Sequence, residues 1–230
     1  MQRAWLWFSV LSAFGGVLSG CGDEDLSGGG GSKVGPLLPW QEGNTWTYEV
    51  TDANGVKTTK VTTVHAEEPV SGTGPNAALS AFRVVTTKGV NGMDETVSWQ
   101  GVRGDAVVRY REQAFGATSG ALSLEEHWEP YKIHIDGSAE RTSETTMPWL
   151  EIYQETKIEA GTTPTPVEVR DLWTVVSASE TVTVPAGTFD AVVLQKIGGS
   201  TKTYWYVWGV GKVKETGGQT EELTSYMVAP

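Results

Sequence analysis

The sequence predicts a mostly all-β domain: a single curved antiparallel sheet, either a half-barrel or an open barrel, with one short helix as a lid. Threonine and valine recur throughout, tryptophan occurs 10 times, and long runs of strong helix formers are scarce. Several segments alternate polar and apolar residues with the period of a strand. Glycine, present 28 times, separates these segments at short intervals without intervening helices. Such spacing is typical of an antiparallel meander.

The composition limits the number of domains and the kinds of partner. A chain of 230 residues with 39% hydrophobic and 20% charged residues suits one domain preceded by a leader. The formal net charge of −11 repels phosphate backbones, so we expect no nucleic-acid partner. The charge also disfavours docking on anionic lipid by electrostatics alone. The sequence identifies no protein partner.

Residues 1–20 have the organisation of a bacterial signal peptide. Arg3 supplies the positive charge, and an apolar run extends from Ala4 to Leu18. That run is shorter than the roughly 20 residues that a membrane span requires, and it fits the core of an export signal. We therefore expect this segment to be removed on export.

The motif Leu-Ser-Gly-Cys at residues 18–21 resembles the lipobox of bacterial lipoproteins. The resemblance implies that Cys21 becomes the first mature residue and carries the acyl chains, including palmitate, that anchor the protein to a membrane. The alternative is an ordinary cysteine behind a conventional signal. The residue after the cysteine is Gly22. In enterobacterial sorting an Asp at this position retains lipoproteins in the inner membrane. By analogy, Gly22 favours the outer membrane of the cell envelope.

A flexible tether, residues 21–38, is expected to join the anchor to a β-rich domain spanning residues 39–230. The tether is rich in glycine, serine and acidic residues, which keep a chain solvated and mobile. The domain begins with a hairpin in which Trp46, Tyr48 and Val50 alternate with polar residues. The turn lies at Asp52–Gly55, and the second strand covers Lys57–Val64.

Further strands follow the same pattern to the C-terminus. They are expected at Phe82–Thr87, Thr96–Gln100, Ala106–Glu112, Glu151–Ile158, Val167–Val176, Glu180–Val184, Ala191–Ile197, Thr201–Trp208, Lys212–Thr216 and Leu223–Val228. Thr118–His127 suits the short helix, and Val70–Ala78 and Gly161–Pro166 are predicted loops.

The segment TKTYWYVWGVGKVKE contains aromatic residues on both faces of one predicted strand. Tyr204, Tyr206 and Trp208 share one face, and Trp205 lies on the other. One interpretation is that these four residues face an apolar ligand, such as a lipid, in a concavity of the sheet. The alternative is a strand buried on both sides that binds nothing.

Three stretches resemble the signature of a group of exported bacterial lipoproteins. They are PLLPWQEGNTWTYEV (36–50), TVTVPAGTFDAVVLQ (181–195) and YWYVWGVGKVKE (204–215). These lipoproteins are related to domains with a half-barrel like that of the lipoprotein carriers LolA and LolB. The resemblance implies a half-barrel and a capacity to bind acyl chains. It covers both ends of the domain but not Val70–Leu172, and Trp208 stands where the signature commonly has proline.

No catalytic constellation is apparent. The chain contains neither a nucleophile elbow nor a phosphate-cradling glycine loop. Potential metal ligands cluster only in EEHWEPYKIHID, where the spacing places His127 and His134 on opposite faces of a strand unless Pro130 introduces a turn. We therefore expect no catalytic residue, metal or cofactor.

The leading hypothesis is a non-catalytic, membrane-anchored envelope lipoprotein with a binding or surface-organising role. One alternative is a carrier or sensor of lipid or another apolar ligand in a half-barrel concavity. The other is a hydrolase that has no recognisable motif.

Overall fold

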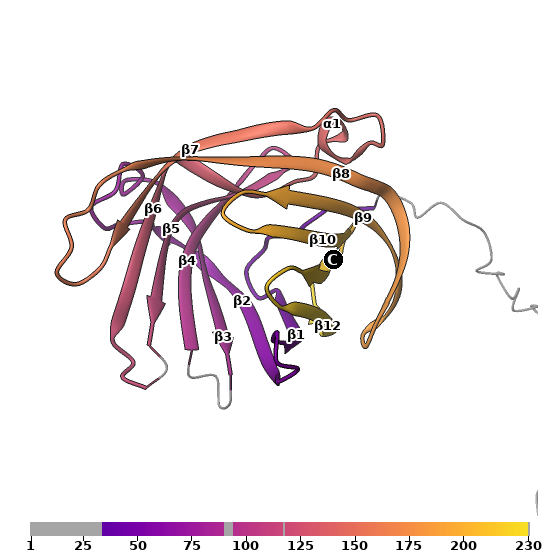
Figure 1. Cartoon of the computed structure of the whole chain (residues 1–230), viewed down its shortest axis with the longest axis horizontal. Coiled ribbons are helices and arrows are strands. Elements are labelled where there is room, and N and C mark those ends of the chain that lie inside the picture. Colours follow the sequence, from indigo (N-terminus) through magenta and orange to yellow (C-terminus); the bar gives the residue numbers. More distant parts are fainter. Residues whose placement is uncertain (1–33, 90–93, 117, 230) are drawn as a thin grey trace, which may run out of the picture.

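A computed structural model describes residues 34–89, 94–116 and 118–229. Within these ranges the chain forms twelve strands and one helix of four residues. The elements are β1 (Thr45–Thr51), β2 (Lys57–Pro69), β3 (Ser80–Lys88), β4 (Asp94–Arg103), β5 (Ala106–Phe115), β6 (Leu122–Asp136), α1 (Ala139–Thr142), β7 (Trp149–Ile158), β8 (Val167–Val184), β9 (Gly187–Ile197), β10 (Thr201–Val207), β11 (Gly211–Thr216) and β12 (Thr220–Met227). Figure 1 shows their arrangement.

The strands form a closed antiparallel barrel in which every strand pairs with its neighbours in sequence. Strand β1 pairs with β2 on one side and with β12 on the other, from Thr45↔Met227 to Thr51↔Thr220. The prediction of a half-barrel or open barrel is therefore wrong. Closure pairs the two edges that an open sheet would leave exposed, and it joins segments at opposite ends of the chain, which local patterning does not reveal.

Most predicted strands are present, but the segment around residues 118–136 was misassigned. The helix expected at Thr118–His127 is wrong, because Leu122–Asp136 is strand β6, paired with β5 and β7. Cross-strand pairing here outweighs the local helix propensity of Leu122, Glu125 and Glu126. The short helix is instead α1, between β6 and β7. The loops predicted at Val70–Ala78 and Gly161–Pro166 are confirmed.

Strand β8 joins two segments that were predicted as separate strands. It runs for 18 residues and shifts register against β9 between Val175 and Glu180. Such irregularities bend a strand. The β8–β9 hairpin accordingly curls towards β12 (Figure 1), where the Ala186 amide donates to the Leu223 carbonyl at 2.9 Å.

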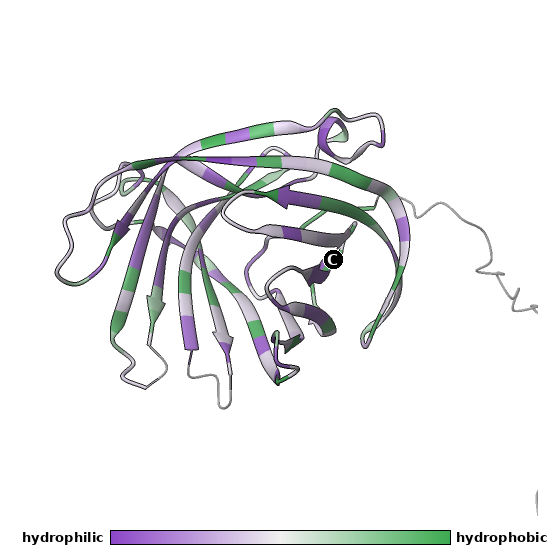
Figure 2. Cartoon of the chain, in the orientation of Figure 1, coloured by the Kyte–Doolittle hydropathy of each residue, from purple (hydrophilic) through white to green (hydrophobic). Residues whose placement is uncertain are grey.

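The main apolar core is completed by the segment that precedes β1. Leu37 and Leu38 are buried with Trp46 and Leu223, and the Trp40 ring stacks on Trp46 at 5.5 Å between centroids. Apolar and polar residues alternate in bands along the strands (Figure 2). A second, smaller core includes Val70, Trp99 and Tyr110. The described part of the chain contains no helix with the length and apolar character needed to span a membrane.

Candidate functional site

The barrel contains a cavity of about 580 Å³, a size common among small-molecule sites. It extends from Trp40 and Trp46 to the exposed β9–β10 turn at Gly199 and Ser200. The wall is unusually rich in charge. Its basic residues are Lys60, Arg109, Lys132, Lys157, Lys196, Lys202 and Lys212, and its acidic residues are Glu112, Glu126, Glu155, Asp171, Glu215 and Glu221.

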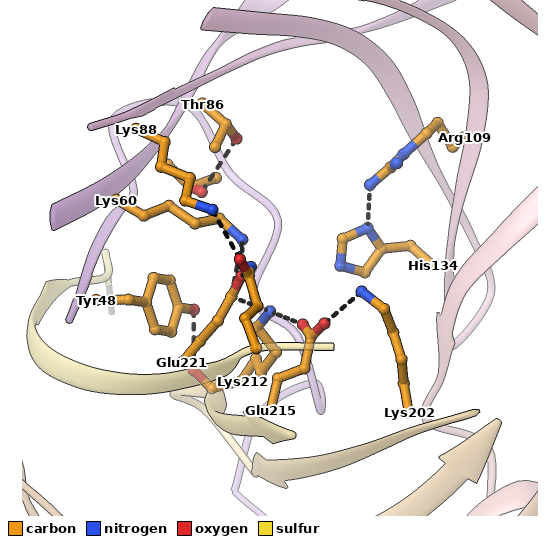
Figure 3. A network of polar contacts seen from close by, with 12 residues as sticks. Tyr48, Lys60, Thr86, Lys88, Arg109, His134, Lys202, Lys212, Glu215 and Glu221 are labelled. Atoms are coloured by element: carbon orange, nitrogen blue, oxygen red, sulfur yellow. Dashed lines mark hydrogen bonds and ion pairs between the residues drawn. The ribbon is translucent and has the colours of Figure 1, made fainter. Parts of the chain in front are cut away.

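The β11–β12 hairpin contributes an ion network to one side of the cavity (Figure 3). Lys212 bonds both Glu215 and Glu221. Lys60 of β2 reaches Glu221 at 2.8 Å, and Lys202 of β10 reaches Glu215 at 2.6 Å. A register irregularity of β11 against β10 lets Lys212 and Glu215 both face the cavity although they are three residues apart, and the barrel brings lysines from other strands to the carboxylates.

The pKa values in this network reflect burial opposed by the ion pairs. Burial alone would raise the pKa of Glu215 and Glu221, but the adjacent lysines lower both below the usual range. Burial alone would lower the pKa of Lys212, but its two carboxylate partners hold it well above 10.5. Lys60 contacts only one of these carboxylates, and burial together with nearby Lys212 lowers its pKa to about 8.

On strands β5 and β6, Arg109 and His134 form a second polar contact across from this network (Figure 3). Arg109 Nη2 lies 3.1 Å from His134 Nδ1. Because arginine can only donate, Nδ1 is the acceptor and the neutral ring carries its proton on Nε2. Burial lowers the pKa of His134 well below 6.5, and the charges of Arg109, Lys212, Lys60 and Lys196 lower it further.

Lys132, beside Arg109, differs from the other basic residues of the cavity. Among the described residues, it is the one lining cation without a carboxylate within ion-pair distance. Its ammonium lies 5.0 Å from the centroid of Trp128 and 5.5 Å from that of Tyr153. Burial, then the charges of Arg109 and Lys196, lower the pKa of Lys132.

The aromatic strand, β10, divides its residues between the cavity and the outer face. Tyr204 and Tyr206 line the cavity. Trp205 points the other way and donates its indole N–H to Glu180 at 2.9 Å. Trp208, beyond the end of β10, packs partly buried against the main core. Cys21 lies outside the described residues.

The two histidines of β6 lie on opposite faces, as their spacing predicted. His134 faces the cavity, whereas His127 belongs to a cluster on the outside that also contains Arg111, Gln113 and Glu125. We call these four residues the outer ion cluster. Within the described ranges, no three His, Cys, Asp or Glu side chains are placed to hold a metal ion.

The loop between β2 and β3 covers the outer ion cluster. Arg111 donates to the Val70 carbonyl at 2.9 Å, and Gly74 packs so closely on His127 that an added Cβ would lie 1.9 Å from Nδ1. Burial alone would raise the pKa of Glu125, but hydrogen bonds from Arg111, Gln113 and His127 lower it to about 2. This closed, neutralised arrangement serves to hold the loop.

Sequence reasoning missed the charged lining of the cavity. A signal was present in β10 and β11, where Lys202 falls on the same face of the predicted strand as Tyr204 and Tyr206, and Lys212 and Glu215 follow closely along the chain. Such charges are usually assigned to solvent, because a lone strand does not show which face is inside. Only the closed barrel shows that these charged side chains face the interior.

The described residues form a closed β-barrel with ion pairs along the wall of its cavity. The chain matches no family model, and no curated protein matches it. Among solved structures, it resembles a protein of Bacteroides fragilis assigned as exported, with a YmcC-like fold: the TM-score is 0.51 and the identity 13%, over 84% of this chain and 100% of that one. A Parabacteroides distasonis protein assigned as a lipoprotein gives a TM-score of 0.48 and 12% identity, over 84% of this chain and 99% of that one. At this identity the first likeness shows a shared fold.

Proposed function

We propose that this protein is a non-catalytic, lipid-anchored component of the bacterial envelope that binds a small polar ligand inside its barrel. The observation that carries the binding role is the cavity of about 580 Å³ with a charged and aromatic wall. Buried charges without solvent are costly unless they are paired, and a polar ligand can supply partners that an apolar one cannot. The wall therefore favours a polar ligand over the acyl chain that the half-barrel resemblance implied.

The envelope location rests on the leader and on Cys21. The export signal and lipobox support lipidation at this residue, and the acidic, glycine-rich segment after it supports a tether. Labelling cells with a palmitate analogue is expected to mark the wild type and not Cys21→Ser. Equal labelling of the two, or none of the wild type, would refute the anchor. Separating the inner and outer membranes would test the outer-membrane assignment.

Blocking the mouth of the cavity tests the binding role. Gly199 lines the cavity at an exposed turn, and an added Cβ there meets nothing within 4 Å, so Gly199→Trp places a large ring at the opening without displacing the backbone. Native mass spectrometry of gently purified protein, alone and with added polar metabolites, should detect a ligand on the wild type. The ligand should be lost from Gly199→Trp and kept by Ser225→Trp, an exposed position outside the cavity. If Gly199→Trp and Ser225→Trp bound the same amount of ligand, or if the wild type bound none, the proposal would be refuted.

A further inference from the structure

Resting on that proposed function, we propose that Arg109, Lys132 and Lys196 form the subsite for an oxyanion of the ligand: a carboxylate or phosphate group carried by a small ring-bearing molecule. We call these three residues the cationic wall. They come from β5, β6 and β9 and all line the cavity.

The barrel brings the three side chains to one region. Arg109 and Lys132 are register partners on neighbouring strands, so their side chains leave the same face of the sheet. Lys132 lies over the Tyr153 ring, whose hydroxyl donates to Asp171 at 3.1 Å. Asp171 in turn is 3.2 Å from the Lys196 ammonium. The wall is therefore continuous from Arg109 to Lys196.

The charge balance of this region leaves room for an anion. Asp171 is bound to Lys196, and Glu112 is 2.8 Å from Arg109. The acids whose charges act on Lys132 are Glu155 and Glu126, but both lie against Lys157, at 3.4 Å and 3.2 Å. Lys132 thus retains a positive charge that no described carboxylate neutralises by contact. An oxyanion beside it would supply the missing partner and form charge-assisted hydrogen bonds.

Neighbouring groups suit the remainder of such a ligand. The neutral His134 ring carries a proton on Nε2, which makes no hydrogen bond within the described residues and can donate to a ligand oxygen. Trp173 stacks near Tyr204, with centroids 5.8 Å apart, and both line the cavity. Aromatic faces bind planar rings and the apolar faces of sugars. The combination favours an anionic group on a ring.

Titration of purified full-length protein in detergent tests the subsite. The probes are inorganic phosphate, benzoate and, as a neutral ring, glucose, each compared with sodium chloride at matched ionic strength. A ligand that binds only the folded state raises the urea midpoint, by an amount that grows with the logarithm of its concentration relative to its Kd. Phosphate or benzoate should raise the midpoint of the wild type beyond the effect of chloride. The stronger probe then shows whether the anion is phosphate or carboxylate.

Lys132→Met removes the charge but keeps a long side chain, and it should weaken binding of the effective anion about tenfold or more. Lys214→Met is the matched control, because Lys214 lies on the outer face of β11, paired with Glu222 at 2.8 Å. Without anion, Lys132→Met should be at least as stable as the wild type, since it removes a partly buried charge that lacks a carboxylate. If Lys132 had a purely structural role, Lys132→Met would instead be less stable than the wild type.

The outcomes separate this subsite from the binding role as a whole. Equal midpoints in phosphate, benzoate and chloride would overturn the subsite, as would full anion binding by Lys132→Met. If glucose or another neutral compound binds in the cavity and is lost in Gly199→Trp while the anions have no effect, the binding role stands and the subsite falls. If no ligand binds the wild type, both fall.

Discussion

Strand β6 carries two histidines whose surroundings differ in one decisive respect. His127, in the outer ion cluster, bonds Glu125 at 2.6 Å, and Arg111 bonds the same carboxylate at 2.7 Å under a covering loop. His134, beside the cationic wall, bonds Arg109 and faces the cavity. The same residue types therefore form a closed cluster on one face of the sheet and an open site on the other.

The difference shows how a structural ion cluster can be told from a binding site. In the outer ion cluster the central carboxylate is held by three donors, and Arg111, Glu125 and His127 are almost wholly buried. In the cavity one cation, Lys132, has no carboxylate within ion-pair distance, and space remains beside it. A cluster paired throughout and without space stabilises the fold, whereas an unpaired cation that faces space is where we propose that a ligand binds.

Removing the arginine of the outer ion cluster should have the largest effect. Arg111→Met leaves the Glu125 carboxylate, 8% exposed, without its charged partner, which costs about 3–5 kcal/mol in comparable buried pairs. Urea denaturation measures the loss. Arg170→Met, at an exposed pair with Glu168, is the control and should change stability little. A small loss from Arg111→Met would mean that the cluster does not hold the loop.

The pH dependence of Glu125 should give a somewhat smaller effect. Its pKa of about 2 in the fold lies below 4.5, so its contribution is complete above about pH 5 and is lost as the pH falls towards 2. The contribution is on the order of 3 kcal/mol. In denaturation curves from pH 6 to 2.5, the stability advantage of the wild type over Glu125→Gln should shrink on acidification. A constant advantage would contradict the assigned hydrogen bonds.

The covering loop can be tested through its glycine. Gly74→Ala places a Cβ 1.9 Å from His127 Nδ1, so the loop must move, at a cost of about 1–3 kcal/mol. Limited proteolysis should then cut residues 70–79 faster than in the wild type. Gly218→Ala, where an added Cβ meets nothing within 4 Å, should behave as the wild type. Unchanged proteolysis in Gly74→Ala would show that the loop does not seal the cluster.

The cavity histidine should give the smallest effect, at higher pH. Because the pKa of His134 lies below 6.5 in the fold, the unfolded chain binds the proton more readily, and stability falls as the pH drops below about 6.5. The slope is at most about 1.4 kcal/mol per pH unit. Comparing wild type with His134→Gln between pH 7.5 and 5.5 should show a steeper loss in the wild type. Parallel curves would mean that His134 is not held neutral.

The strand positions could be predicted because each depends on nearby residues. The alternation of Trp46, Tyr48 and Val50, and the turn chemistry after them, define the first hairpin without reference to the rest of the chain. Strand β6 was missed because its pattern is irregular, with register shifts against β5 at several points. Its identity as a strand depends on the neighbours with which it pairs.

The sequence alone determined the β class and the spacing of most strands, because these follow from the period of a strand. The tertiary structure decided that β1 pairs with β12 and that a charged face turns inward. Alternation shows that a strand has two faces but does not show which one a closed barrel encloses. For that reason the aromatic residues of β10 were predicted as ligand-facing, while the lysines and glutamates that share the cavity with Tyr204 and Tyr206 were not.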